Sequence, residues 1–179
     1  MSGKTVYLGL GSNVGDREQT LQAAIDRLQS PELRITRVSS VYETEPQQRR
    51  NQRWFLNLVV EAETDLFPRQ LLGRIARIEQ QLGRRRLLAN GPRTIDIDIL
   101  FYGSFVVATP GLQIPHPRFA ERRFVLAPMA ELAPELRDPR TRRTMREMLP
   151  ATAGQGVRKV KFQPVVRGEG SPAAALNQR

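Results

Sequence analysis

The stretch Thr94-Ile95-Asp96-Ile97-Asp98-Ile99-Leu100-Phe101 decides the fold of this chain. Its isoleucines alternate with polar residues, which is the pattern of a β-strand with one buried face. Residues two apart in a strand point to the same side, so we expect the three isoleucines and Phe101 to face the core. Asp96 and Asp98 then face away from it, and the strand presents two neighbouring carboxylates on one side.

The segments before this strand alternate between strand-like and helix-like patterns. A helix is expected to begin after Asp16 and to end before Ser30, and a second one to run from Pro68 to Leu82. Strands are expected at 6–10, 33–42 and 54–63. The order β-α-β-β-α-β is that of ferredoxin-like sheets. We therefore expect an α+β fold: an antiparallel sheet with both helices on one face and the other face free for ligands.

The second part of the chain has shorter elements. The pair Gly103-Ser104 suits a two-residue hairpin turn that would pair the strand at 94–101 with residues 105–107. Short helices are expected at 124–132 and 141–149, and a weak strand or extended arm at 157–166. The predicted organisation is a single domain over 1–162 with a disordered tail at 163–179.

Composition indicates one soluble domain, since the 179 residues are 40% hydrophobic and 26% charged. The absence of cysteine excludes a disulfide scaffold, a Cys-ligated zinc site and a thiol nucleophile. A multi-histidine metal site is excluded as well, because His116 is the only histidine. No signal peptide or membrane segment is recognisable, so we expect a cytoplasmic protein, and a monomer.

The charge pattern suggests a phosphate-bearing partner. The formal net charge is +10, and all but three of the 28 basic residues are arginine. Arginine suits forked contacts with phosphate oxygens. Charge alone fits a nucleic acid and a polyphosphate ligand equally well.

The two aspartates are the strongest chemical signal. Neighbouring carboxylates repel unless a cation lies between them, and Mg²⁺ binds one or two carboxylates together with substrate phosphates. The run Arg84-Arg85-Arg86, Arg93 and Arg122 surround this strand in sequence and would hold the phosphate oxygens. The alternative is a solvent-facing strand with ordinary surface ion pairs.

Four other features are more ambiguous. Phe55 and Asn57 share the non-core face of their strand and suit stacking and pairing with a flat heterocycle, although each in isolation is more typical of a surface residue. Trp54 falls on the core-facing register and is expected to pack there. The glycine-rich stretch 9–15 lacks the spacing of a phosphate loop and predicts a tight turn. His116, between two prolines, is either structural or a phosphate contact.

At this point the chain resembles the 6-hydroxymethyl-7,8-dihydropterin pyrophosphokinase family. The matching stretches follow the family's order, and the most specific of them is Gly91-Pro92-Arg93-Thr94-Ile95-Asp96-Ile97-Asp98. The others are Leu8 to Asp16, Ser39 to Pro46, Phe55-Leu56-Asn57, Ile114 to Arg118 and Arg122 to Leu126.

The resemblance implies a ferredoxin-like fold and an ATP-dependent pyrophosphokinase of folate biosynthesis. Such an enzyme transfers pyrophosphate from ATP to the hydroxymethyl group of the pterin and releases AMP. The resemblance further implies that Asp96 and Asp98 hold two Mg²⁺ ions bridging the ATP phosphates. A pterin pocket is implied at Thr44, Phe55, Asn57 and Phe124, with the two aromatic rings stacking on opposite faces of the pterin.

The resemblance also implies the remaining ATP site. Its members would be Glu79, Arg84, Arg86, Arg93, Ile99, His116 and Arg122, and Arg84 and Arg93 would be catalytic alongside the two aspartates. The expected partners are ATP and the hydroxymethyl-dihydropterin, with neither a nucleic acid nor a membrane.

Some residues depart from the family pattern. Asn90 stands where the family often has tryptophan, and the loop 45–53 carries Arg49 and Arg50 where glycine and proline are expected. Two other functions therefore stay open: a catalytically inactive relative, and an RNA-binding module, because a basic βαββαβ domain is also typical of RNA recognition. An aromatic-poor sheet and the two exposed acids disfavour the RNA-binding function.

Overall fold

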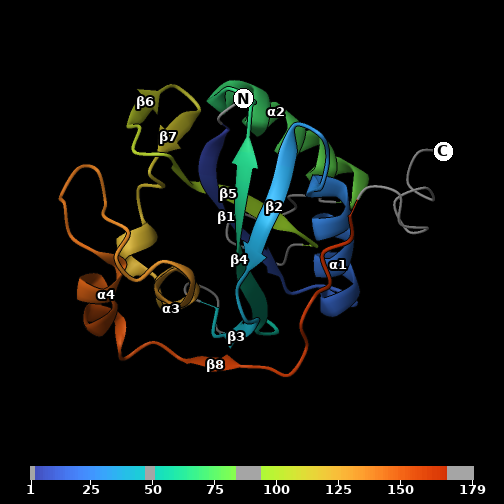
Figure 1. The fold of residues 1–179 in the computed structure, drawn as a ribbon. Helices are drawn as coiled ribbons and strands as arrows, with labels where there is room; N and C mark the ends of the chain where they lie inside the picture. Colours follow the sequence, from blue (N-terminus) through green and yellow to red (C-terminus); the bar gives the residue numbers. More distant parts are fainter. Residues whose placement is uncertain (1–2, 47–50, 84–93, 169–179) are drawn as a thin grey trace.

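The computed structural model describes residues 3–46, 51–83 and 94–168 and contains one six-stranded antiparallel sheet (Figure 1). The strand order is β5-β1-β4-β3-β8, and β2 pairs with another part of β4. Every pairing in the sheet is antiparallel. The strands are β1 (Lys4–Ser12), β2 (Leu33–Val38), β3 (Tyr42–Thr44), β4 (Phe55–Thr64), β5 (Asp96–Tyr102) and β8 (Val157–Lys159).

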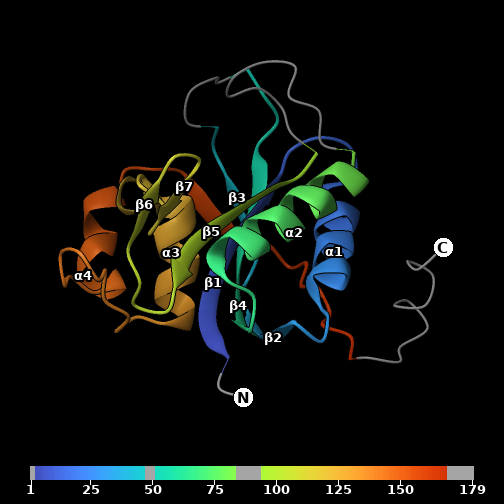
Figure 2. The same cartoon turned by 90° about the horizontal axis from the view of Figure 1, so that it is seen from above.

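Helices α1 (Arg17–Leu28) and α2 (Pro68–Gln81) cover one face of the sheet (Figure 2), as the β-α-β-β-α-β order predicted. Asp16 caps α1, since its carboxylate accepts a hydrogen bond from the Gln19 amide at 3.0 Å. The apolar stripes of both helices and the alternate residues of the strands form the main core. None of the helices in the described ranges is both long enough and apolar enough to cross a membrane.

The opposite face of the sheet is not free, contrary to the sequence expectation. Helix α3 (Arg123–Leu132) packs against β4 there, on the side away from α1 and α2 (Figures 1 and 2). A second apolar cluster fills this interface and includes Phe101, Phe119 and Met129. It is completed by α4 (Met145–Met148) and the 3₁₀ segments η1 (Phe119–Glu121) and η2 (Leu149–Thr152). The predicted helices at 124–132 and 141–149 thus form a second layer.

A bulge in β5 explains why Phe101 joins this second layer instead of the main core. Leu8 pairs with Ile99 and Tyr7 pairs with Phe101, so Leu100 is an extra residue between the two pairs. Leu100 and Phe101 therefore both lie on the face of the second cluster, and the alternation of faces changes between them. The prediction that Phe101 lies beside the isoleucines was wrong for this reason.

The predicted strand at 33–42 is two strands, β2 and β3. The chain leaves the ladder at Ser39, whose amide donates to the Val59 carbonyl at 2.9 Å and whose hydroxyl accepts from the Val59 amide at 2.9 Å. This side-chain bond replaces one regular ladder contact and separates the two strands.

The predicted hairpin at Gly103-Ser104 was wrong. Gly103 does adopt a positive φ of 53° in a turn, but no strand returns to β5 from it. The hairpin forms one element later, where β6 (Val107–Thr109) pairs with β7 (Leu112–Ile114).

The C-terminal arm, residues 157–168, lies along β3 and α1. Its first three residues form β8, which pairs with β3, and the rest is extended. Gln22 of α1 exchanges two hydrogen bonds of 2.8 Å with the backbone of Val165, and Arg167 pairs with Asp26 at 2.7 Å. Residues 163–168, which we expected in a disordered tail, are therefore held in place. Residues 169–179 lie outside the described ranges.

Candidate functional site

A cavity of about 130 Å³ opens on the face of the sheet that carries α3. Strands β1, β3, β4 and β5 supply its floor, and the segment from Arg118 to Val125 supplies a side. Its lining consists of Gly9, Leu10, Gly11, Thr44, Glu45, Pro46, Gln52, Phe55, Asn57, Leu58, Val59, Asp96, Asp98, Leu100, Arg118, Arg122, Phe124 and Val125.

Asp96 and Asp98 both line this cavity, as the alternation of β5 predicted. They lie opposite Gly11 and Gly9 of β1, so no side chain of the neighbouring strand screens them from the cavity. In the described part of the chain, no group of three or more His, Cys, Asp or Glu residues is placed to hold a metal. A pair of carboxylates fits Mg²⁺, because that ion keeps waters or substrate phosphates as its other ligands.

Of the described residues expected at the ATP site, Glu79, Ile99 and His116 do not line the cavity. Glu79 is buried on α2, where its carboxylate accepts a hydrogen bond from the Ile97 amide at 3.4 Å. It therefore contacts β5 between the two aspartates, from the core side. The Ile99 side chain is buried in the main core.

The expected pterin contacts lie together in the cavity. Asn57 is only 8% exposed and its amide donates to the Thr44 hydroxyl at 2.6 Å. Phe55 is half-buried, and Phe124 approaches from α3. Asn57 is thus a buried polar group that needs partners, and not the surface amide that the sequence alone favoured.

Gly11 makes room for this arrangement. A Cβ atom at position 11 would lie 2.5 Å from the Asn57 side-chain oxygen. The absence of a side chain at Gly11 therefore lets the Asn57 amide lie over β1. This role was not predicted from the sequence, although glycine at alternate positions 9 and 11 of a strand was a visible signal.

Arg118 and Arg122 make one side of the cavity cationic, and we call this side the cationic wall. Arg122 lies at the N-terminus of α3, with its guanidinium 5.5 Å from the centroid of the Phe124 ring. Burial lowers the pKa of Arg122, and nearby Arg118 lowers it further, while Asp98 and Asp96 raise it. Crowded arginines beside two carboxylates suit a ligand with several phosphate oxygens.

His116 lies next to this wall. The backbone amide of His116 donates a hydrogen bond to the Leu100 carbonyl, at the β5 bulge, at 3.2 Å. Its Nδ1 accepts from the Arg118 amide at 3.3 Å, which leaves Nε2 as the protonated nitrogen of the neutral ring. Burial is the largest cause that lowers the pKa of His116, followed by the charge of Arg122. The neutral ring can donate one hydrogen bond to a phosphate.

Three expected site residues, Arg84, Arg86 and Arg93, lie outside the described ranges, as does Asn90. Trp54 is described, and the prediction that it packs in the core was wrong: it is 37% exposed. Its ring lies 5.9 Å from the guanidinium of Arg158.

Comparison with known proteins gives a consistent result. The family model described as 7,8-dihydro-6-hydroxymethylpterin-pyrophosphokinase (HPPK) matches residues 7–134. The 2-amino-4-hydroxy-6-hydroxymethyldihydropteridine pyrophosphokinase of Bacillus subtilis is 47% identical over 131 residues, which are 73% of this chain and 78% of the relative. The protein of the same name from Aquifex aeolicus is 43% identical over 146 residues, 82% of this chain and 91% of the relative.

The fold is also similar to solved structures. A crystal structure of Plasmodium falciparum HPPK-DHPS with pterin and p-hydroxybenzoate superposes with a TM-score of 0.69 at 17% identity. The match covers 83% of this chain and 43% of that longer chain. This likeness concerns the α/β fold with its antiparallel sheet.

Proposed function

The chain belongs to the HPPK family, and from this premise we propose that the cavity between β5 and α3 is its active site. The family's reaction is transfer of pyrophosphate from ATP to the hydroxymethyl group of hydroxymethyldihydropterin in folate synthesis.

The pterin binds, in this proposal, at Thr44, Phe55, Asn57 and Phe124. The two aromatic rings sandwich a flat heterocycle, and the Asn57 amide with its Thr44 partner pairs with the heterocycle's polar edge. The burial of Asn57 and its 2.6 Å bond to Thr44 support the assignment, because they fix the amide before any ligand arrives.

ATP binds, in this proposal, along the cationic wall. Arg122 and His116 contact phosphate oxygens, and we keep Arg84, Arg86, Arg93, Glu79 and Ile99 as further members of the ATP site, with Arg84 and Arg93 catalytic. Asp96 and Asp98 would hold two Mg²⁺ ions, which neutralise charge on the phosphates. The donor chemistry of the paired carboxylates in the cavity supports this assignment.

The chain's contribution to the reaction is positioning and charge complementarity. The pterin hydroxyl oxygen bonds to the β-phosphorus of ATP and loses its proton to water, and the bond from that phosphorus to the α,β-bridging oxygen breaks, so that AMP leaves. The stacked rings hold the hydroxymethyl group in line, and the arginines stabilise negative charge that spreads over the phosphate oxygens.

The finer description of the scaffold is also a proposal. We assign the sheet to the ferredoxin-like class, supported by the order β5-β1-β4 followed by β2 and β3. We assign residues 1–162 to a single domain, against which residues 163–168 pack through α1. We expect a monomer that works in the cytoplasm. Sedimentation velocity of the purified protein tests whether it is a monomer.

The observation that carries the functional proposal is that Asp96 and Asp98 share one cavity with Asn57, Phe55 and Arg122. The test is incubation with ATP, Mg²⁺ and 6-hydroxymethyl-7,8-dihydropterin, with AMP and ADP separated by chromatography. AMP is expected as the nucleotide product. Release of ADP alone, or no turnover together with salt-sensitive RNA binding, would refute the proposal in favour of the alternatives.

Matched variants locate the site. Asp98→Asn should lower turnover at least about a hundredfold, since it removes a metal-binding charge worth several kcal/mol in the transition state. Asp65→Asn removes an exposed aspartate that does not line the cavity and should retain turnover. Equal activity of the two variants would remove the carboxylate pair from the mechanism.

A further inference from the structure

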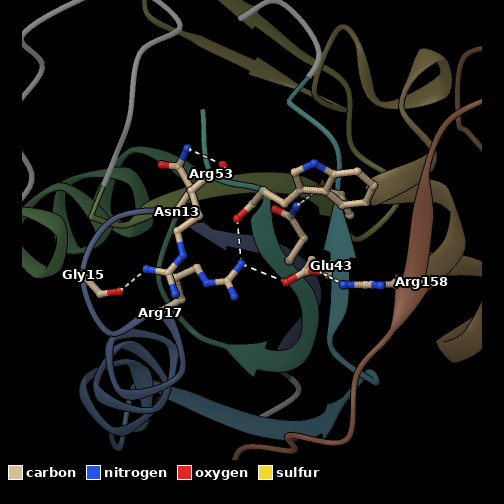
Figure 3. Close-up of polar contacts among 9 residues, drawn as sticks. Asn13, Gly15, Arg17, Glu43, Arg53 and Arg158 are labelled. Carbon is tan, nitrogen blue, oxygen red and sulfur yellow. Dashed lines mark hydrogen bonds and ion pairs between the residues drawn. The ribbon is translucent and has the colours of Figure 1, made fainter. Parts of the chain in front are cut away.

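A cluster of charged groups joins four segments of the chain behind the cavity floor. Arg17, at the start of α1, donates to the Glu43 carboxylate at 3.1 Å and to the Trp54 carbonyl at 2.7 Å (Figure 3). Arg158 of the C-terminal arm donates to the other oxygen of the same carboxylate. We call Arg17, Glu43, Arg158 and the Trp54 carbonyl the Glu43 cluster.

The Glu43 cluster holds the strand ends that carry the expected pterin contacts. Glu43 directly precedes Thr44 in β3, and Trp54 directly precedes Phe55 in β4. Thr44 and Phe55 are cross-strand partners, and both line the cavity. Because successive residues of a strand point to opposite faces, Glu43 anchors β3 from behind while Thr44 faces the ligand.

β3 needs such an anchor, since it has only three residues. The C-terminal arm covers its outer edge: β8 pairs with it, and the Glu45 amide donates to the Gly156 carbonyl at 3.1 Å. The Val160 amide donates to the Val41 carbonyl at 2.9 Å and extends this contact past the end of the strand.

The segment that leads into β4 is held from the same side. The side-chain amide of Asn13 donates to the Arg53 carbonyl at 3.2 Å, and the Arg53 guanidinium donates to the Gly15 carbonyl at 2.8 Å (Figure 3). The turn between β1 and α1 therefore fixes the approach to Phe55, and Arg17 continues this contact to the Trp54 carbonyl.

The inner pair of the Glu43 cluster is shielded from solvent. The side chains of Arg17 and Glu43 are 15% and 14% exposed, whereas Arg158 is largely exposed. Hydrogen bonding from Arg158 is the largest cause that lowers the pKa of Glu43, and Arg17 lowers it as well. Removal of Glu43 leaves the shielded Arg17 without its carboxylate partner, and removal of Arg17 leaves Glu43 paired only with the exposed Arg158. Either change is therefore expected to perturb the strand ends that the cluster joins.

We propose that Arg17, Glu43 and Arg158 are positioning residues for pterin binding. They fix the ends of β3 and β4, and thereby the spacing of Thr44, Phe55 and Asn57 across the cavity. This inference rests on the proposed function, which assigns those three residues to the pterin. It gives a role to the C-terminal arm, which lies beyond the residues that the family model matches.

The test compares two carboxylates that are equally shielded. Glu43 and Glu61 are each 14% exposed, and each is paired with arginine, but Glu61 does not line or adjoin the cavity. Glu43→Gln should raise the Kd of hydroxymethyl-dihydropterin about tenfold, since small misplacements of contact groups are costly. Glu61→Gln should change this Kd less than twofold. Both constants are measured by calorimetry with Mg²⁺ and a non-hydrolysable ATP analogue.

Two further measurements distinguish positioning from a general loss of stability. The Kd of the ATP analogue alone should change less than twofold in Glu43→Gln. Arg17→Met should weaken pterin binding as Glu43→Gln does, and Arg17→Lys should recover part of the loss because it restores the charge. The two Arg17 variants keep the test informative if Glu43→Gln fails to fold.

The inference is overturned if folded Glu43→Gln and Arg17→Met bind the pterin within twofold of the unaltered protein, or if they lose ATP-analogue binding to the same degree. Asn57→Ala in the same assay distinguishes this failure from failure of the proposed function. If Asn57→Ala loses pterin binding while Glu43→Gln and Arg17→Met keep it, only the positioning role is refuted. No loss in Asn57→Ala refutes the pterin assignment, and the positioning role with it.

Discussion

Gly11→Ala is the most informative single substitution in the cavity floor. The added Cβ would meet the Asn57 side-chain oxygen at 2.5 Å, and the two atoms must separate by about 0.9 Å to reach ordinary contact near 3.4 Å. A shift of that size breaks the 2.6 Å bond from Asn57 to Thr44. Loss of a buried hydrogen bond costs about 1–3 kcal/mol, so the Kd of the pterin should rise roughly 5- to 150-fold.

Gly9→Ala is the matched control, because Gly9 lies two residues earlier in the same strand. Its Cβ would meet the tip of Leu100 at 3.3 Å, which a flexible side chain accommodates. Calorimetric titration with hydroxymethyl-dihydropterin and thermal unfolding should be run on both variants. If Gly11→Ala folds and binds the pterin as tightly as Gly9→Ala does, Asn57 does not contact the pterin.

Three further outcomes are expected. Burial lowers the pKa of His116 below 6.5, so the unfolded chain binds the extra proton at a higher pH than the folded protein does. The free energy of unfolding should therefore fall as pH drops below about 6.5. Urea titrations between pH 7.5 and 5.5 should show a smaller fall in His116→Gln than in the unaltered protein. Hydrogen bonding from Arg37 lowers the pKa of Glu61 from 4.5 to about 2, so this stabilisation is present above pH 4.5 and is lost as pH falls through about 2. Glu61→Gln should therefore lower the free energy of unfolding by roughly 1–3 kcal/mol at pH 7 and by much less at pH 2.5, and an equal loss at both pH values would contradict the assignment. Arg122→Met should raise the Kd of the ATP analogue roughly tenfold without changing the unfolding midpoint, whereas unchanged binding by calorimetry would remove Arg122 from the ATP site.

The sequence predicted the elements whose hydrophobic period is regular. The helix after Asp16, the helix from Pro68 and the alternation at 94–99 all follow from side-chain spacing, which is a local property. The prediction failed at Leu100, where a bulge reverses the alternation. It failed again at Ser39, where a side-chain hydrogen bond ends a strand that has no proline or glycine to mark the break.

The second layer was the larger omission. A helix at 124–132 was expected, but local pattern does not say which face of the sheet a helix covers. The candidate site was predicted better than its surroundings, because the face on which the two aspartates lie depends only on the side-chain period of one strand. Gly11 and Glu43 were missed because their roles depend on Asn57, Arg17 and Arg158, which are distant in sequence.

The C-terminal arm has a consequence for the order in which the protein is completed. During synthesis, the outer edge of β3 stays uncovered until residues 156–160 have left the ribosome, more than a hundred residues after β3 itself. An uncovered strand edge can pair with other chains. A nascent or truncated polypeptide that ends before Gly156 would therefore carry a site for aggregation next to an unfinished pocket, and proteolytic trimming from the C-terminus would recreate that site in the mature protein.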